Sequence, residues 1–292
     1  MSLQSITGEK TDISSFYVSN SIVENALNSY YEGQGEKALK LLATALKTQR
    51  LTLGDADICV AHTLGNIGAV YVSMGWYEEA IEVLEESLAI NTKLRNDPSI
   101  KLPKGCEQIN LYENLNNLGS ASFLAGDYLN AMSYYQECLK DLTGGEIPGT
   151  ASEIANTLFN IGNCHAVHEN ELDDALVAMV ESLELIQANF GPEDTRCAET
   201  LERIGAIYMK KNQLEEAMNA FVEVLRITKM TLGSEHVDCA PSLYNVGLIY
   251  ERKRENRRAM DSFKAAMEIY ESNGVKDESI DRVRQHMMHL KI

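Results

Sequence analysis

LGNIG (residues 64–68) is the stretch that decides the fold, because the chain repeats it four more times. The other copies are LNNLG (115–119), LFNIG (158–162), LERIG (201–205) and LYNVG (243–247). Their closing glycines are separated by 51, 43, 43 and 42 residues. A recurring spacing of this length indicates a tandem array of one supersecondary unit, stacked so that each copy contacts its neighbours.

An alanine follows each closing glycine at a nearly constant distance. It lies twelve residues on in four copies and thirteen on in the third: Ala80, Ala131, Ala175, Ala217 and Ala259. The same spacing projected backward predicts a sixth, degenerate copy around Ala26 and Ala38. Small side chains let two antiparallel helices pack closely, so we expect the glycine of the first helix to lie near the alanine of the second.

Turn residues separate the two expected helices of each copy. A left-handed residue must end the first helix, and glycine and asparagine adopt that conformation most readily. We expect it at Gly33, Gly75, Gly126, Asn170 and Asn212. The last copy departs from this rule, because Arg254 takes the place within the basic turn ERKRENRR (251–258).

The landmark residues resemble the tetratricopeptide repeat. Its Gly-x-x-Tyr element on the first helix is matched by Tyr71, Tyr208 and Tyr250, and its alanine lies twelve residues past the glycine. The additional residues beyond the common unit of about 34 follow the second helix, as in TLGDADICVA (52–61). This lengthened form is similar to the repeat of kinesin light chains. The resemblance implies an all-α fold, a right-handed superhelical α-solenoid of about six helix–turn–helix repeats plus a C-terminal capping helix.

These spacings divide the chain into segments. We expect a flexible N-terminal segment over 1–18, and over 273–292 a capping helix that covers the apolar face of the last repeat. Pro98 and Pro103 interrupt the region 93–110, which predicts an exposed loop or a short extra turn there. The six repeats are expected over 19–60, 61–111, 112–154, 155–197, 198–239 and 240–272.

Charge and composition exclude several classes of partner. The chain has 43 acidic and 26 basic residues, a net charge of -17, which would repel a nucleic acid. No stretch approaches about 18 consecutive apolar residues, so we expect no membrane insertion. The six cysteines are scattered singly, which is typical of buried thiols in a reducing compartment, and we expect a cytoplasmic location.

The sequence contains no recognised catalytic motif. A GxxxxGK phosphate loop, a GxSxG elbow and an HExxH zinc motif are all missing from it. His165 and His168 are three residues apart on an expected helix, a spacing that could place two imidazoles on one metal. His165 occupies the tyrosine position of its repeat, so we favour a packing role, and the same holds for His286 and His289. We predict a protein that is not an enzyme and that has no cofactor or metal.

Candidate binding residues lie on the first helix of each repeat, which lines the concave wall of a solenoid. In the arrays that this chain resembles, asparagines two residues before the landmark glycine hydrogen-bond the backbone of an extended peptide. An amide suits this role because it offers both a donor and an acceptor. The alternative is that these residues only join neighbouring helices. The positions are Asn66, Asn117, Asn160, Arg203 and Asn245.

Neighbouring residues on the same wall are candidates for selectivity. Asn163 and Tyr244 are polar or aromatic, whereas Arg203, Lys210 and Arg252 add positive charge. That charge favours a partner with an acidic segment, through charge-assisted hydrogen bonds, although these long side chains could equally point to solvent.

Two functions stay open on the sequence. The favoured one is a protein–protein interaction scaffold or adaptor that holds an extended peptide or a helical segment of a partner in its groove. The alternative is a regulatory module that binds a folded partner, or a second copy of the chain, through outer or terminal surfaces. The loop 93–110 and the basic turn 251–258 would then matter more than the asparagines.

Overall fold

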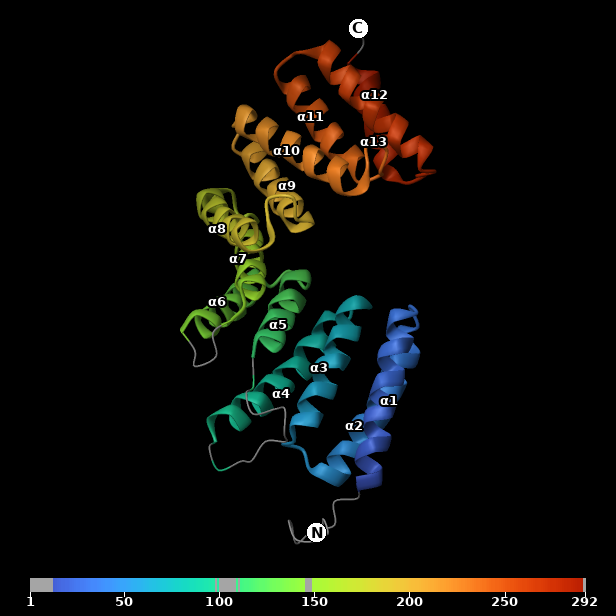
Figure 1. Ribbon diagram of the computed structural model, residues 1–292, viewed down its shortest axis with the longest axis vertical. Coiled ribbons are helices and arrows are strands. Elements are labelled where there is room, and N and C mark those ends of the chain that lie inside the picture. The colour runs from blue at the N-terminus through green and yellow to red at the C-terminus, as the bar shows by residue number, and fades with distance from the viewer. Residues whose placement is uncertain (1–12, 98, 100–108, 110, 145–148, 291–292) are drawn as a thin grey trace. The chain divides into compact units, whose positions relative to one another are not determined.

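A computed structural model describes residues 13–97, 99, 109, 111–144 and 149–290, with side chains from residue 21 onward. These residues form α-helices joined by short connections, and no strand occurs among them (Figure 1). The chain divides into two compact units, residues 1–149 and 150–292. No helix in the described ranges is long and apolar enough to cross a membrane.

The first unit consists of three helix pairs. In each pair the two helices pack against each other, and the second helix of one pair packs against the first helix of the next. The pairs are α1 (Ile13–Tyr31) with α2 (Gly35–Leu53), α3 (Ile58–Ser73) with α4 (Tyr77–Asn96), and α5 (Tyr112–Leu124) with α6 (Tyr128–Gly144).

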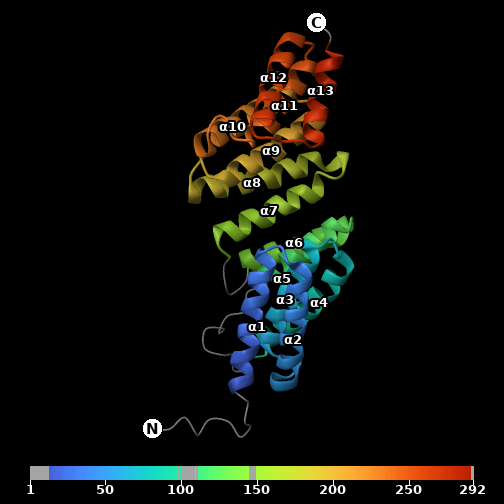
Figure 2. The ribbon, with the colours of Figure 1, turned by 90° about the vertical axis from the view of Figure 1, so that its right-hand side faces the viewer.

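The second unit repeats this arrangement and adds a last helix. Figure 2 shows α7, α8 and α9 stacked in chain order. A short 3-10 helix, η1 (Glu169–Glu171), precedes α8. The elements are α7 (Ala151–His165) with α8 (Leu172–Phe190), α9 (Thr195–Lys210) with α10 (Leu214–Leu232), α11 (Cys239–Arg252) with α12 (Asn256–Ser272), and α13 (Glu278–His289). The predicted all-α fold of consecutive helix pairs is confirmed.

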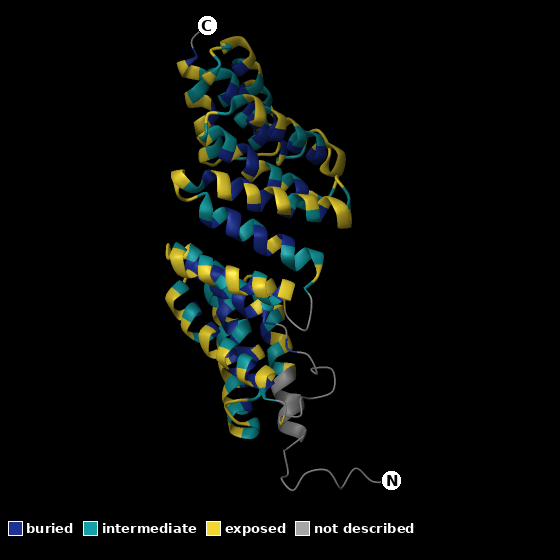
Figure 3. Cartoon of the chain, turned by 90° about the vertical axis from the view of Figure 1, so that its left-hand side faces the viewer, coloured by how far each residue is buried: buried dark blue, intermediate teal, exposed yellow. Residues whose placement is uncertain are grey.

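Most of the helices carry both buried and exposed residues (Figure 3). The buried residues form clusters within and between neighbouring pairs. One such cluster joins Leu84 of α4 to Leu118 of α5, which binds two successive pairs into one unit. Burial of this apolar stripe is what stabilises helices of such length.

The landmark glycines make room for a large side chain of the second helix. A Cβ at Gly119 would lie 2.5 Å from Tyr135, and one at Gly247 would lie 2.5 Å from Phe263. A Cβ at Gly68 would likewise overlap Leu84. These partners lie sixteen residues past their glycines. In these three copies the atoms nearest such a Cβ belong to a large residue one turn beyond the buried alanine, whereas at Gly162 they include the Ala175 carbonyl oxygen at 3.2 Å.

The turns follow the predicted chemistry with two exceptions. Gly33, Gly75, Gly126 and Asn212 are left-handed, with φ between 57° and 84°. Asn170 is not, because the additional residue of this copy is accommodated in η1 and α8 begins only at Leu172.

Arg254 adopts the left-handed conformation although it is not glycine, with φ of 60°. The amide of Glu255 donates to the Tyr250 carbonyl oxygen at 2.9 Å and holds this turn closed. The departure of the last copy from the turn rule is therefore one of sequence and not of backbone geometry.

Two boundaries differ from those expected. α1 begins at Ile13, inside the segment 1–18 that was expected to be flexible, and residues 1–12 lie outside the described ranges. α4 continues through Asn96, so the first four residues of the predicted loop 93–110 are helical. Pro98 and Pro103 lie outside the described residues.

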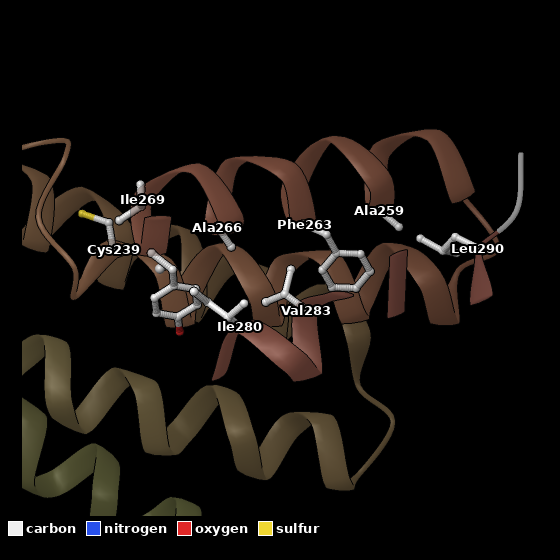
Figure 4. Close-up of a cluster of buried hydrophobic side chains, with 10 residues drawn as sticks. Cys239, Ala259, Phe263, Ala266, Ile269, Ile280, Val283 and Leu290 are labelled. Atoms are coloured by element: carbon white, nitrogen blue, oxygen red, sulfur yellow. The ribbon is translucent and has the colours of Figure 1, made fainter. Parts of the chain in front are cut away.

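α13 packs on α12 at the end of the second unit. Its Ile280 and Val283 lie in one buried cluster with Phe263 of α12, together with Leu290 (Figure 4). This contact removes from water an apolar surface that a following repeat would otherwise cover.

Candidate functional site

A polar hollow of about 290 Å³ opens on the first unit between α3, α4 and α5. Asn66 of α3 and Asn117 of α5 both line it, although 51 residues separate them in the sequence. The helix pairs bring them together because each stands two residues before its landmark glycine. The structure thus places two of the predicted binding residues in one site.

The amides of Asn66 and Asn117 are available for a ligand. Both side chains are half-buried, and neither makes a hydrogen bond with a residue that the structure describes. If these asparagines only joined neighbouring helices, their amides would bond to the adjoining helix. At these two positions the structure shows no such bond among the described residues.

A buried hydrogen-bonded network forms the floor of the hollow. The Ser87 hydroxyl donates to the Ala61 carbonyl oxygen at 2.7 Å, and Asn114 Nδ2 donates to Ser87 Oγ at 2.7 Å. Asn91 Nδ2 donates in turn to Asn114 Oδ1 at 2.8 Å. These side chains are at most 6% exposed, so the network fixes their orientation beneath the hollow.

One acceptor of this network is unused. Asn91 Oδ1 is buried and accepts no hydrogen bond from any described residue. A buried acceptor without a partner costs about 1–3 kcal/mol, so such an atom needs an explanation. Asn91 lines the hollow, which makes a ligand that donates a hydrogen bond there one explanation.

Gly65 is a helical glycine that packing does not require. A Cβ at this position would meet only Ser87 Oγ, at an ordinary contact distance of 3.8 Å. Glycine within a helix nevertheless costs about 1 kcal/mol relative to alanine. The corresponding positions of the other four copies carry side chains: Asn116, Phe159, Glu202 and Tyr244. The missing side chain of Gly65 leaves the hollow open.

A second hollow of about 230 Å³ lies within the second unit and contains two more of the predicted residues, Tyr244 and Asn245. Tyr244 is mainly a packing residue, since its ring lies 5.7 Å from those of both Phe263 and His286. Burial raises the pKa of the Tyr244 hydroxyl. Burial likewise raises the pKa of the Glu202 carboxyl, which also lines this hollow.

Two of the predicted basic residues hydrogen-bond to neighbouring repeats. Lys210 Nζ donates to the Ala166 carbonyl oxygen at the end of α7, and Arg252 Nη1 donates to the Met209 carbonyl oxygen near the end of α9, both at 2.7 Å. Lys210 therefore bonds a carbonyl just past the C-terminus of α7, whereas Arg252 adds a second hydrogen bond to the Met209 carbonyl oxygen, which also accepts from the Asn212 amide at 3.2 Å. Both side chains remain partly in solvent.

The residue after each of these also reaches the preceding repeat. Lys211 pairs with Asp173, and Lys253 pairs with Glu215 at 2.6 Å. The paired basic residues thus form the same two contacts at two successive junctions of the second unit.

The remaining predicted residues line neither hollow. Asn160 and Asn163 are half-buried on α7, and Arg203 is exposed on α9. Their role in binding stays a prediction.

Two of the four histidines singled out in the sequence contact carboxylates. His165 Nδ1 lies 2.9 Å from Glu171 Oε2, and His286 Nδ1 lies 2.8 Å from Glu251 Oε2. No group of three metal-ligating side chains occurs within the described residues.

Sequence reasoning missed the floor and the opening of the hollow. Gly65 carries a signal, since it is a second glycine in one helix and lies outside the landmark spacing. Asn91 and Asn114 carry none, because their pairing depends on the packing of α4 against α5.

Comparison with known proteins agrees with this architecture. The tetratricopeptide repeat profile matches residues 18–93, 153–230 and 196–272, and a related profile of the same repeat matches residues 112–140. The chain belongs to the tetratricopeptide repeat family. The family expected from the landmark residues is confirmed. No curated protein matches the sequence significantly.

Several solved tetratricopeptide-like structures share the fold. BtubC (BKLC) from P. vanneervenii has 14% identity and a TM-score of 0.62, with 92% of this chain and 94% of that chain covered. The apo form of RapI has 14% identity and a TM-score of 0.70, with 94% of this chain and 71% of that chain covered. A third structure contains the nearly identical TPR-like repeats of a putative kinesin light chain from Podosopora anserina. It has 16% identity and a TM-score of 0.59, with 74% of this chain and 96% of that chain covered.

Proposed function

We propose that this tetratricopeptide repeat protein is an interaction scaffold that holds an extended peptide segment of a partner protein. Asn66 and Asn117 would hydrogen-bond the peptide backbone in the hollow of the first unit. The observation that carries the proposal is that two unpaired amides, from the first helices of successive repeats, line one hollow.

The chemistry of the hollow suits a peptide better than a small substrate. An asparagine amide presents a donor and an acceptor together, which matches the C=O and N–H groups of a peptide unit. The ionisable residues of the lining are Glu113 and His62, and both are exposed. Neither shows the burial and close charge partner that are typical of a catalytic acid or base, so we propose a protein that is not an enzyme.

Two further properties belong to this proposal. A partner with an acidic segment is supported by Arg203, which is exposed and forms no ion pair with a described residue, and less by Lys210 and Arg252, which hold carbonyl oxygens. A cytoplasmic location is supported by the five described cysteines, which are free thiols. Burial raises the pKa of the Cys164 thiol to about 12, which leaves this group inert toward oxidation.

The proposal is tested by selecting peptides from a random dodecapeptide display library with the full chain as bait. The wild type and the double variant Asn66→Ala/Asn117→Ala are compared. Asn219→Ala is the matched control, since Asn219 is exposed on α10, outside both hollows.

We expect peptides that are enriched by the wild type and by Asn219→Ala but not by the double variant. Circular dichroism should be the same for all three proteins. Peptides enriched equally by the double variant, or the failure of the wild type to enrich any, would contradict the proposal.

A further inference from the structure

We propose that the hollow of the first unit is a pocket for one basic side chain, a lysine or an arginine, of the bound peptide. This inference rests on the proposed function and adds the class of side chain that the site selects. It is carried by the shape of the hollow, by its unused acceptor and by its charge.

The shape suits a long, thin side chain. Gly65 has no side chain, and two further small residues, Ala61 and Ala69, belong to the same lining. A lysine or arginine stem consists of methylene groups that pack favourably against such a wall while the charged end continues beyond it. A peptide backbone bonded to Asn66 and Asn117 would lie across this opening, so that one of its side chains points toward the floor.

The floor presents an acceptor where that side chain would end. Asn91 donates its amide hydrogen to Asn114, which leaves Asn91 Oδ1 as an acceptor with no partner among the described residues. An ammonium or guanidinium group is a pure donor, with three or five hydrogens and no lone pair to conflict with this oxygen.

The charge of the lining points the same way. Glu113 also lines the hollow, and its carboxylate forms no ion pair or hydrogen bond with a residue that the structure describes. Neither lysine nor arginine contributes to the lining, in a chain of net charge -17. A cation partly shielded from water would gain a charge-assisted hydrogen bond from Glu113, whereas an acidic side chain would be repelled.

The second hollow offers a contrast. Tyr244 and Glu202 stand at the position that corresponds to Gly65, and Arg282 of α13 already supplies a guanidinium to that lining. The first hollow lacks such an internal cation among its lining residues. The proposal therefore applies to the first unit alone.

The test uses defined peptides, so that it does not depend on the library selection. The isotope-labelled full chain is titrated with a capped Gly-Gly-Lys-Gly-Gly peptide, and the side-chain amide signals of Asn66, Asn91 and Asn117 are followed by NMR. The same peptide with norleucine in place of lysine keeps the stem without the charge. Arginine and glutamate versions complete the set.

We expect the lysine or the arginine peptide, or both, to shift these amide signals, with an affinity at least tenfold above that of the norleucine and glutamate peptides. Glu113→Gln should weaken the basic peptide at least threefold. Gly65→Phe, which introduces the residue of the LFNIG copy (Phe159), should abolish the shifts. If Gly65→Phe fails to fold, the affinity of Glu113→Gln for the basic peptide still tests the inference.

Equal shifts from the norleucine and lysine peptides, stronger shifts from the glutamate peptide, or no shift from any peptide would overturn this inference. A different result would contradict the proposed function: enrichment of library peptides that does not require Asn66 and Asn117. Library peptides that require these asparagines but have no fixed lysine or arginine would refute the basic pocket and leave the peptide scaffold standing.

Discussion

The two units are built from the same kind of helix pair, but the charged side chains that link successive pairs lie on different helices. In the first unit, Arg50 of α2 pairs with Glu86 of α4, and Arg95 of α4 pairs with Asp141 of α6, so the ion pairs join second helices. In the second unit, Lys210 and Arg252 join the ends of first helices. The first helices α3 and α5 have uncharged residues at the corresponding places: Ser73, Met74, Leu124 and Ala125.

The two units also differ in the surroundings of their predicted binding residues. The first unit leaves Asn66 and Asn117 without partners above a hydrogen-bonded floor. In the second unit, Asn245 lines a smaller hollow of about 230 Å³ that it shares with the side chain of Tyr244 and with Arg282 of α13. Residues that share a position in the repeat therefore do not share the same surroundings, because the neighbouring helices determine which residues each one contacts.

The largest expected effect comes from removing the large side chain beneath a landmark glycine. Phe263→Ala should lower the free energy of unfolding by about 3–5 kcal/mol, because it leaves a cavity in the core of the second unit. Leu84→Ala should cost about 2–5 kcal/mol in the first unit.

Amide hydrogen exchange resolves where each change acts. Phe263→Ala should reduce protection in α11, α12 and α13 and leave α3, α4 and α5 unchanged, and Leu84→Ala should do the reverse. Equal loss of protection throughout the chain after either change would contradict the division into two units.

The next effect contrasts two glycines of one helix. Gly68→Ala should cost about 1–3 kcal/mol, since its Cβ would overlap Leu84. Gly65→Ala should instead stabilise the chain by about 0.5–1 kcal/mol, since its Cβ has room and alanine is the better helix former. Urea denaturation of both variants measures the difference. A loss of stability in Gly65→Ala would mean that packing requires this glycine.

Much of the fold follows from the sequence, for a physical reason. The packing of Gly119 under Tyr135, and its counterparts, recurs at a fixed spacing, so the helix pairs are visible without coordinates. Asn170 was mispredicted because one inserted residue changes a turn from a left-handed residue to a 3-10 helix.

The site was only partly predictable. Asn66 and Asn117 could be predicted from the repeat, because each lies two residues before a landmark glycine. The contacts of Lys210 and Arg252 could not be predicted, since every residue has a backbone carbonyl and the sequence does not show which one a side chain will reach. The Asn91–Asn114 bond joins two repeats, so no pattern within one copy reveals it.

The basic junctions of the second unit should have a smaller effect. Lys210→Met and Arg252→Met should each lower the free energy of unfolding by at most about 1 kcal/mol, because both side chains are exposed and their bonds compete with water. Peptide binding in the first unit should not change. A loss of binding to selected peptides in either variant would show that these residues contact the ligand, as the sequence first suggested. Thermal denaturation and fluorescence polarisation provide the two measurements.

The smallest effect concerns pH in the second hollow. Burial raises the pKa of Glu202 above its usual 4.5, so the ionised carboxyl opposes folding at neutral pH. This penalty is fully present above the raised pKa and is lost as the pH falls toward 4.5. Glu202→Gln should therefore be more stable than the wild type at pH 7, and the advantage should shrink as the solution is acidified. An advantage independent of pH would contradict the raised pKa of this carboxyl, which lines the hollow although much of the residue is exposed.

The central claim is that the first unit binds peptide through Asn66 and Asn117. The most direct measurement is the affinity of a library-selected peptide for two matched double variants, Asn66→Ala/Asn117→Ala in the first unit and Asn160→Ala/Asn245→Ala in the second. We predict a loss of at least about tenfold, equivalent to about 1.4 kcal/mol, in the first and no more than about twofold in the second. Equal losses in both, or a larger loss in the second, would contradict the account.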